Sequence, residues 1–460
     1  MQRAGASAAI EAGLGTVRHP ARSSEGDLQG PSSALVLLLA VFFWLEYARP
    51  AGIVNLRLQF LISLLLPLAW IAAPRKPWSP ILTYQFAFLV QCALHVPLAL
   101  NNFAAYMTTR AMYGNVAIAV AMSWLLTKRR SFALMCWMWV LVMAWAAVKG
   151  IMQGGRGPGG FLRDENDLAL GLTTAIAFSM TMMASLRGVQ RLLSAGLTGL
   201  FAVGIVLSFS RGGFLAMAAV AFYFFLGSRH KIRDLGIVMV MAATFMLFAP
   251  KEYLSEIGTI SNTQESTALR RQFLWATAVN IWKDHVVFGA GPGNFQFLAG
   301  DYQPRDGGWP EEYFQRSSSG TVTHSTYFQL LAEQGLIGVG LFAAIVWTHF
   351  RTLRKLLADV HDNPAATPEL TSHVEAYARA LGGAMLGALA GGAFLSTLYY
   401  PYVWYLSGMA VALSVGARRE LRATQLEKGH PEDVTPITVG VRSRDERSAG
   451  MGVKGDVSRV

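Results

Sequence analysis

Four residues suited to phosphate binding and proton transfer lie at the ends of apolar segments of this 460-residue chain. His324 carries an imidazole, the one side chain whose ordinary pKa lies near neutrality and therefore suits a general base. Arg211, Arg270 and Arg271 carry guanidinium groups, which keep their charge and bind phosphate through paired hydrogen bonds. Together these residue types predict chemistry on a phosphate-bearing substrate with a proton acceptor nearby.

Each of these residues also has a structural interpretation. A lone histidine at a helix start is more often structural than catalytic, and an arginine at a helix end often reaches out to lipid headgroups. Arg211 lies in the short turn 208–213, so it must sit at or just inside the membrane interface, where a cation is costly unless it is paired or lines a wet cavity. Because two glycines follow it and permit close approach of a ligand, an anionic ligand and a headgroup contact both stay open.

Further polar residues stand close to the same boundaries. Asp164 or Asn166 is expected to cap a helix, since such side chains accept hydrogen bonds from the free amides of a first turn. The alternative is that Asn166 and Asp167 face a polar substrate cavity, to which Tyr327 would also contribute. The motif 289–295 contains three glycines but lacks the Lys and Ser or Thr of a phosphate-binding loop, so we expect a tight turn with Asn294 capping the next helix.

Aromatic residues mark the polar segment that precedes His324. Tyr302, Trp309 and Tyr313 occur there among Gly, Pro and Ser, a composition suited to a mobile loop that stacks on sugar rings. Earlier in the same loop, the segment 266–285 has apolar residues at helical spacing with Trp275 among them, which predicts an amphipathic helix at a membrane interface.

The composition places the chain in a membrane. Of its residues 53% are hydrophobic and only 15% are charged, which is too apolar for an ordinary soluble protein. The net charge of +11 comes from short basic clusters between apolar runs, which indicates contact with anionic membrane lipid and no nucleic-acid partner. Cys92 and Cys136 lie within apolar runs, so neither a disulfide framework nor a metal site is expected.

We expect an all-α polytopic membrane protein with about twelve transmembrane helices and one large periplasmic helical loop, because a span needs about 20 apolar residues. The candidate spans are 34–49, 52–73, 81–100, 104–126, 132–150, 166–186, 191–209, 212–227, 234–250, 325–350, 377–396 and 399–417. Lys and Arg fall in alternate loops, which by the positive-inside rule places both termini in the cytoplasm. The spans at 34–49 and 212–227 are the shortest, and losing one would invert part of this topology.

The expected domain organisation follows from these spans. It comprises a disordered cytoplasmic tail at 1–33, transmembrane helices one to nine at 34–250, a periplasmic loop with the amphipathic helix at 251–323, transmembrane helices ten to twelve at 324–417, and a second disordered cytoplasmic tail at 418–460.

The motifs occur in a distinctive order along the chain. They are Ser210-Arg-Gly-Gly at a span boundary, Arg270 and Arg271 followed by Trp275, Gly289-x-Gly-x-Gly-x-Phe295, and His324-x-x-Tyr327 followed by Glu333-x-Gly-Leu-x-Gly338. This ordered set resembles the O-antigen ligase and Wzy-type polymerase superfamily. Two features depart from the pattern: Ser325 follows the histidine where the family often has Asn, and the arginine pair leaves open which member acts.

The resemblance implies a glycan transfer without a metal ion or other cofactor, on the periplasmic face of a bacterial inner membrane. It implies a glycan donor on undecaprenyl diphosphate, with a sugar hydroxyl of lipid A core as acceptor. His324 would be the catalytic base, and Arg211, Arg270 and Arg271 would bind the diphosphate. A ligase is favoured; the alternatives are a Wzy-type polymerase, which extends another lipid-linked repeat, and a protein O-oligosaccharyltransferase.

A polytopic lipid or glycan transporter is the alternative of another class. Transporters usually place ionisable residues near the middle of a span and often show two related halves. In this chain most charges lie near the ends of spans and no related halves are visible, which favours the transferase.

Overall fold

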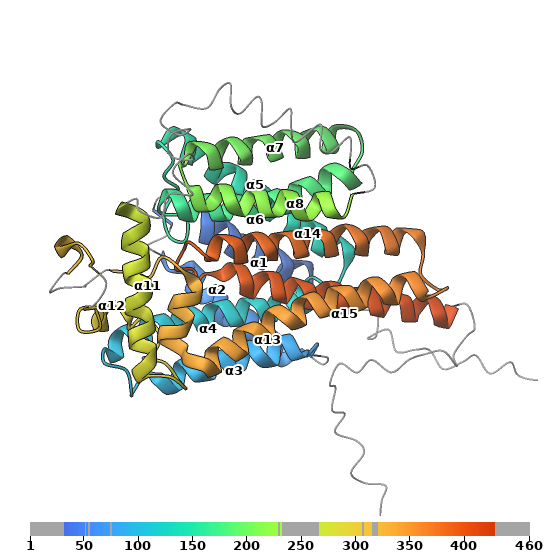
Figure 1. Ribbon diagram of the computed structural model, residues 1–460. Helices are drawn as coiled ribbons and strands as arrows, with labels where there is room; N and C mark the ends of the chain where they lie inside the picture. The colour runs from blue at the N-terminus through green and yellow to red at the C-terminus, as the bar shows by residue number, and fades with distance from the viewer. Residues whose placement is uncertain are drawn as a thin grey trace, which may run out of the picture.

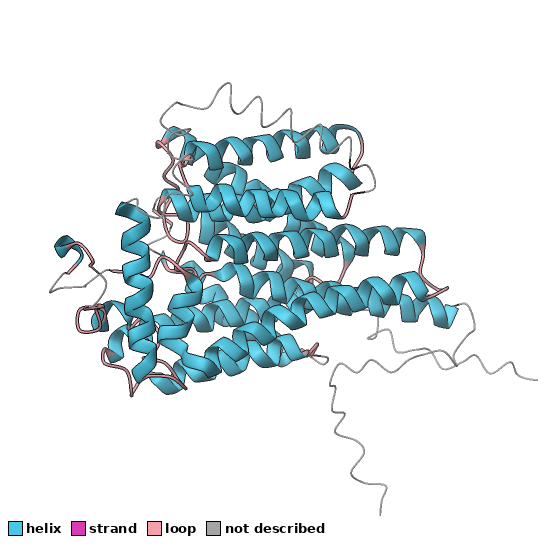
Figure 2. Cartoon of the chain, in the orientation of Figure 1, coloured by secondary structure: helices cyan, strands magenta, loops and turns pink. Residues whose placement is uncertain are grey.

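The computed structural model describes residues 32–50, 52–53, 56–73, 76–228, 231, 266–305, 308–314 and 321–427. Within these ranges all regular elements are helices (Figure 2), so the expected all-α class is confirmed there. The helices are α1 Ser33–Ala48, α2 Leu58–Ala72, α3 Pro80–His95, α4 Asn102–Leu125, α5 Arg129–Met152, α6 Glu165–Ser185, α7 Gly188–Leu207, α8 Arg211–Leu226, α11 Ser266–Asp284, α12 Phe295–Leu298, η3 Glu311–Tyr313, α13 Thr326–Asp362, α14 Pro368–Gly392 and α15 Pro401–Glu427.

The long helices form one bundle, and α11 runs crosswise over one of its ends (Figure 1). Helix α6 occupies a central place, since it packs against α5, α7, α8 and α14. Helix α15 packs against α3, α4, α13 and α14. A second, smaller core lies under α11 and joins it to the segment that follows. The helix predicted at 266–285 is therefore present as α11, while its place at a membrane interface stays a prediction.

Local sequence signals set where several helices begin. Ser79 accepts a hydrogen bond from the Leu82 amide and is followed by Pro80, while Thr367 accepts one from the Leu370 amide and is followed by Pro368. A hydroxyl that caps free amides, followed by proline at the first helical position, favours helix initiation at that point.

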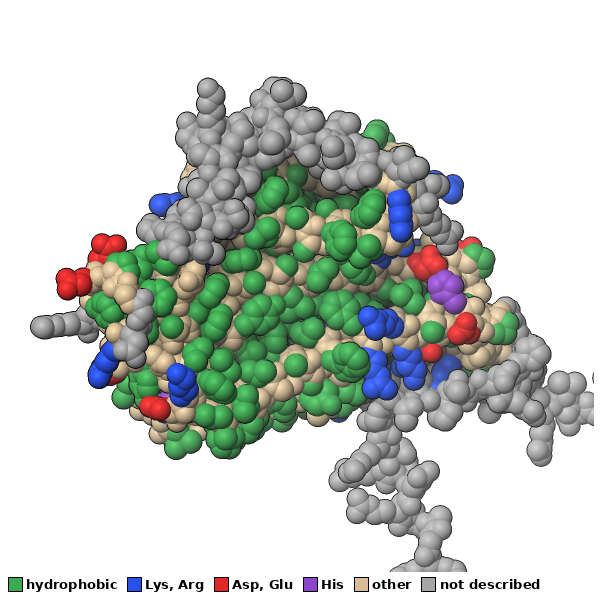
Figure 3. Space-filling view, viewed as in Figure 1, with side chains coloured by type: hydrophobic (Ala, Val, Ile, Leu, Met, Phe, Trp, Pro, Cys, Tyr) green, Lys and Arg blue, Asp and Glu red, His purple; other side chains and the backbone are tan. Residues whose placement is uncertain are grey.

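Four helices in the described residues are long and apolar enough to cross a membrane, namely α5, α6, α7 and α13. The helices α1, α2 and α8 are apolar but shorter; sixteen residues extend about 24 Å, against about 30 Å of hydrocarbon. Hydrophobic side chains cover the side of the bundle shown in Figure 3, and charged ones gather toward its two ends. The chain thus has the surface of a membrane protein, while the count of twelve spans stays a prediction.

Several boundaries differ from those expected. The span expected at 52–73 corresponds to α2, which begins only at Leu58, and the span expected at 81–100 corresponds to α3, which ends at His95. Helix α15 continues to Glu427, ten residues into the expected tail. The span expected at 234–250 and most of both expected tails lie outside the described residues.

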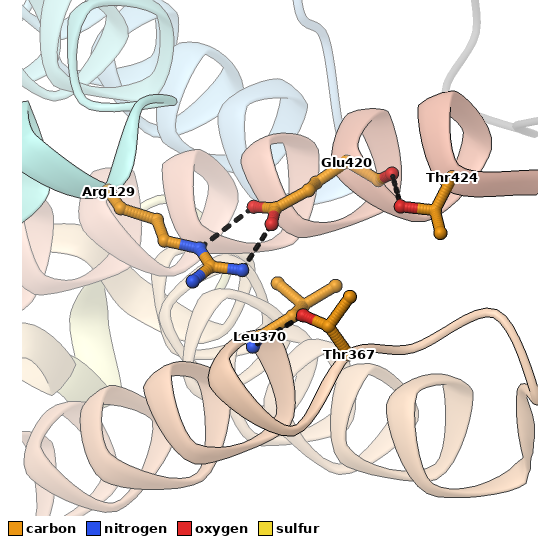
Figure 4. Close-up of polar contacts among 5 residues, drawn as sticks. All are labelled: Arg129, Thr367, Leu370, Glu420 and Thr424. Atoms are coloured by element: carbon orange, nitrogen blue, oxygen red, sulfur yellow. Dashed lines mark hydrogen bonds and ion pairs between the residues drawn. The ribbon is translucent and has the colours of Figure 1, made fainter. Parts of the chain in front are cut away.

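Ion pairs explain why α15 continues. At the end of the bundle opposite α11, Arg129 at the start of α5 donates two hydrogen bonds to the Glu420 carboxylate (Figure 4). On the same stretch of α15, Arg418 lies 3.1 Å from Asp359 of α13. These contacts hold the polar end of α15 on its neighbours and so favour helix beyond the apolar segment.

Candidate functional site

His324 lies at the end of the bundle that α11 crosses, two residues before α13 begins. Its backbone φ is 51°, in the left-handed region, which residues with a side chain adopt at a cost. The preceding Thr323 is held from two sides. Its carbonyl oxygen accepts a hydrogen bond from Trp275 Nε1 at 3.0 Å, and its hydroxyl lies 3.0 Å from that of Ser396. These contacts maintain the unfavourable backbone conformation that presents His324.

Charged residues from two elements act on the His324 imidazole. Partial desolvation lowers the pKa of His324 below its ordinary value and Arg271 lowers it further, whereas Asp164 raises it and Arg270 adds a smaller decrease. The side chain is still exposed, so a substrate can reach it. A histidine with a lowered pKa is neutral near pH 7 and can accept a proton. The structure thus brings together three of the four residues singled out first.

Arg211, the fourth, is the first residue of α8 and lies at the same end of the bundle as the start of α6. The two helix starts are joined because the Ser210 hydroxyl donates to Asn166 Oδ1 at 2.8 Å while accepting from the Gly213 amide at 3.0 Å. The free amides and dipoles of both N-termini therefore point to this end, and such termini favour an anion.

The loop at 393–400, between α14 and α15, connects the α8 start with the start of α13. A methyl group placed on Gly212 would lie 3.0 Å from Phe394 Cβ, so α8 and this loop are in close contact. On the other side, the Thr326 hydroxyl donates to the Leu395 carbonyl at 2.7 Å. The neighbour of Arg211, Gly212, therefore contacts the loop at 393–400, and so does Thr326, two residues after His324.

This loop was missed by the sequence prediction, which placed only a two-residue turn between spans ending at 396 and starting at 399. The polar pair Ser396 and Thr397 and the two tyrosines before Pro401 are the signal that marks an irregular segment here. A count of apolar residues alone does not distinguish this loop from the helices α14 and α15 on either side of it.

The polar residues at the start of α6 have protein partners. Asp164 Oδ1 accepts a hydrogen bond from the Asp167 amide at 2.8 Å, so the predicted helix cap is confirmed on Asp164. Asp167 is 7% exposed and its carboxylate accepts from the Tyr400 hydroxyl at 3.1 Å. Asn166 binds Ser210, as described above. A substrate role for Asn166 and Asp167 stays a prediction.

Helix α13 is interrupted at Gly335, where φ is 59° and ψ is −164°, a conformation that essentially only glycine adopts. The bend is visible in Figure 1. In a continuous helix the amides of 336 and 337 would donate to the carbonyls of 332 and 333. At the bend these four backbone groups instead make four hydrogen bonds with the segment 286–291. They join Leu336 N to Val286 O at 2.9 Å, Ile337 N to Val287 O at 3.1 Å, Ala290 N to Ala332 O at 2.9 Å, and Gly291 N to Glu333 O at 2.9 Å.

The Glu333 carboxylate explains why the glycine-rich motif and the motif after His324 occur together. Glu333 is 2% exposed and accepts hydrogen bonds from the Gly293 amide at 3.0 Å, the Phe295 amide at 3.2 Å and the Tyr399 hydroxyl at 2.8 Å. A buried carboxylate that accepts several donors fixes the groups around it. Glu333 therefore holds the segment 286–295 on α13 and has a structural role.

Asn294 differs from expectation. It occupies the position before α12, but its side chain makes no capping hydrogen bond. Instead its Oδ1 accepts from the Asn101 amide at 2.8 Å, which ties the glycine-rich turn to the start of α4. The prediction of a cap was wrong because a partner distant in sequence takes the acceptor.

The aromatic residues expected to stack on sugars lie around α11. Tyr313 is 7% exposed, and its ring packs on Phe273 with the centroids 5.8 Å apart. Trp309 packs against the same ring at 5.6 Å, and Tyr302 lies 6.4 Å from the ring of His285. Tyr313 thus belongs to the small core under α11. Stacking on a sugar stays a prediction for Trp309 and Tyr302, which are partly exposed.

Two hollows flank the start of α13. One lies beside α11 and is lined by Arg270, Phe273, Leu274, Thr277, Ala299, Gln303, Tyr313 and Thr321. The other lies among α13, α14 and α15 and is lined by Thr326, Tyr327, Phe342, Ala388, Leu389, Gly392, Thr397 and Val403. Tyr327, expected in a substrate cavity, thus lines the second hollow, where its hydroxyl donates to the Leu389 carbonyl at 2.7 Å.

A helical bundle with an apolar flank, and with a histidine, arginines and helix N-termini gathered at one end, defines a polytopic membrane protein with a polar site at that end. Residues 196–343 match the family described as O-antigen ligase. The predicted resemblance to the O-antigen ligase and Wzy-type superfamily is therefore confirmed over this segment, which contains Arg211, Arg270, Arg271 and His324. The match supports a glycan transferase of the ligase or polymerase type. No curated protein matches the chain.

Proposed function

We propose that this protein is an O-antigen ligase-like glycosyltransferase of the bacterial inner membrane. It would move a glycan from undecaprenyl diphosphate to a sugar hydroxyl of lipid A core on the periplasmic face. The observation that supports this function is the grouping of His324 with Arg270 and Arg271 within the O-antigen ligase segment, at the end of the bundle where α8 begins with Arg211.

In the proposed reaction the acceptor hydroxyl oxygen bonds to the anomeric carbon of the donor sugar. The bond from that carbon to the diphosphate oxygen breaks, and its electron pair stays on the diphosphate. Fixed guanidinium groups stabilise the charge that develops there. Arg211 at the N-terminus of α8 and one arginine of α11 would supply them, because both lie at the same end of the bundle.

His324 would take the proton from the acceptor hydroxyl. That hydroxyl becomes acidic only as its oxygen bonds to carbon, so a base of moderate strength suffices. The lowered pKa of His324 keeps the imidazole neutral and ready to accept. The protonated imidazole would then lie near Asp164, whose carboxylate favours the charged form.

The two arginines of α11 have different surroundings, which suggests a division of roles. Arg271 exerts the larger effect on His324 and is half-buried, so we assign it to the reacting diphosphate. Arg270 is exposed and lines the hollow beside α11, with Tyr302 and Trp309 on neighbouring segments. We assign this side to the acceptor glycan.

The test is the glycolipid profile of cells that carry single substitutions. His324→Ala and Arg211→Ala should abolish attachment of polymer to the acceptor while the protein stays in the membrane. Arg211→Lys should restore it poorly, because lysine lacks the paired donors. His361→Ala and Arg191→Ala, which change the same residue types elsewhere, should keep the normal ladder. A normal ladder from both site variants would overturn the proposal.

The same profile distinguishes the alternatives within the superfamily. Loss of a ligase leaves long polymer on the lipid carrier, whereas loss of a polymerase leaves single repeat units on the acceptor. Loss of a protein O-oligosaccharyltransferase removes glycan from a protein and leaves the glycolipid unchanged.

A further inference from the structure

The second half of α13 presents one exposed line of residues along its length. They are Leu336, Gly340, Ala343, Trp347, Arg351, Arg354 and Ala358. Steps of three and four residues place them on a single helix face. The line is apolar as far as Trp347, which is 67% exposed, and becomes basic about 6 Å further along the axis. This sequence of apolar residues, tryptophan and cations is expected where a helix passes from hydrocarbon into headgroups.

Three cations lie close together near the end of this line. Within the described residues Arg351, Arg354 and Lys355 make no ion pair. All three are exposed. Figure 3 shows Lys and Arg side chains gathered toward this end of the bundle.

The carboxylates closest along the two helices already have partners. Asp359 Oδ2 of α13 lies 3.1 Å from Arg418 Nη2. Glu375 Oε1 of α14 lies 2.8 Å from His361 Nε2. These two carboxylates are therefore already engaged, and in the described part of the chain none is paired with Arg351, Arg354 or Lys355.

Two of the arginines converge from different helices. Arg354 of α13 and Arg379 of α14 both act electrostatically on the hydroxyl of Tyr223, near the end of α8. Arg379 also donates to the Gly227 carbonyl at 3.2 Å, and this bond fixes its guanidinium at the helix end. Two guanidinium groups beside a phenol hydroxyl are a suitable donor set for a phosphate.

We propose that Arg354 and Arg379 bind the phosphate of an anionic phospholipid headgroup, with Arg351 and Lys355 beside it and Trp347 at the boundary with the acyl chains. A lipid fits better than a soluble anion because the cations continue an exposed apolar helix face. This site lies at the end of the bundle opposite His324, on the cytoplasmic side of the proposed topology, and is separate from the proposed transfer reaction.

The experiment measures lipid binding to the purified full-length protein in an uncharged detergent by native mass spectrometry, with phosphatidylglycerol and phosphatidylcholine as probes. A direct hydrogen bond from a guanidinium to the charged phosphate strengthens binding about tenfold, which an arginine elsewhere on the surface does not do. The double variant R354Q/R379Q should therefore bind phosphatidylglycerol about 100-fold more weakly. The matched control is R187Q/R191Q, which removes two exposed arginines at the start of α7, at the same end of the bundle.

The proposal is supported if R354Q/R379Q loses affinity for phosphatidylglycerol while the control stays within about twofold of the unmodified protein, and if phosphatidylcholine binds weakly to all three. Equal losses in both variants would show a diffuse effect of charge and overturn it. Unchanged binding in R354Q/R379Q, or equal binding of the two lipids, would also overturn it. Monodisperse elution of each variant confirms that the protein measured is folded.

Discussion

The bend in α13 makes a sharp prediction about Gly335→Ala. At this position φ is 59° and ψ is −164°, and an added Cβ would lie 2.5 Å from the Gly289 amide nitrogen and 2.6 Å from the Val287 carbonyl oxygen. The backbone conformation alone costs a residue with a side chain about 1–3 kcal/mol. Relief of the contacts moves the segment 286–291 away from α13 and weakens at least two backbone hydrogen bonds, each contributing about 1 kcal/mol. We expect a loss of about 3–5 kcal/mol in the free energy of unfolding.

Gly340→Ala is the matched control, because it makes the same chemical change five residues further along the same helix. Gly340 is helical and a Cβ there would meet no atom within 4 Å, so alanine should stabilise the helix by about 0.5–1 kcal/mol. The assay is thermal unfolding of both variants in the same detergent, followed by intrinsic fluorescence, together with glycan transfer in cells. Gly335→Ala should unfold several degrees lower and transfer less glycan.

The opposite ranking would refute this reasoning. If Gly335→Ala unfolds at the same temperature as Gly340→Ala, the four bonds between α13 and the segment 286–291 do not restrain the native state.

Three further predictions concern charge. Arg271→Gln removes a cation that lowers the pKa of His324; the pKa rises, so the neutral base forms only at higher pH and the acid limb of the transfer rate should move to higher pH. Glu333→Gln replaces an acceptor of two amides and a hydroxyl with a group that also donates, and should cost about 2–3 kcal/mol in unfolding free energy, measured in detergent. Arg129→Gln breaks the ion pair with Glu420, in which each side chain is about one-third exposed. Because exposed ion pairs contribute little, the free energy of unfolding should fall by at most about 1 kcal/mol, and glycan transfer should be kept.

Each of these has a control and a contrary outcome. Arg270→Gln should shift the pH profile less than Arg271→Gln, and an equal or larger shift would contradict the assigned roles. Gln329→Ala removes only a weak contact to Glu333, at 3.5 Å, and should be much milder than Glu333→Gln. Arg130→Gln changes the residue next to Arg129, and a loss of stability equal to that of Arg129→Gln would assign no special role to the ion pair.

Much of the chain could be predicted from its sequence because the signals are local. Apolar runs long enough to form helices, with caps such as Asp164, predict where most helices lie, since hydrophobic burial and capping act over a few residues. The same holds for α11, whose tryptophans and apolar spacing indicate an amphipathic helix. Residue chemistry alone selected His324 and the arginines as candidates.

The tertiary structure decided what those residues contact. Only the folded chain shows that the loop at 393–400 touches both α8 and α13, that Asn294 binds Asn101 rather than capping α12, and that Tyr313 is packed beneath α11. Residues far apart in sequence make each of these contacts, and local propensity carries no information about them. The bend at Gly335 has the same origin: its cost in helical hydrogen bonds is offset by four bonds to a segment about 45 residues earlier, which no local pattern could reveal.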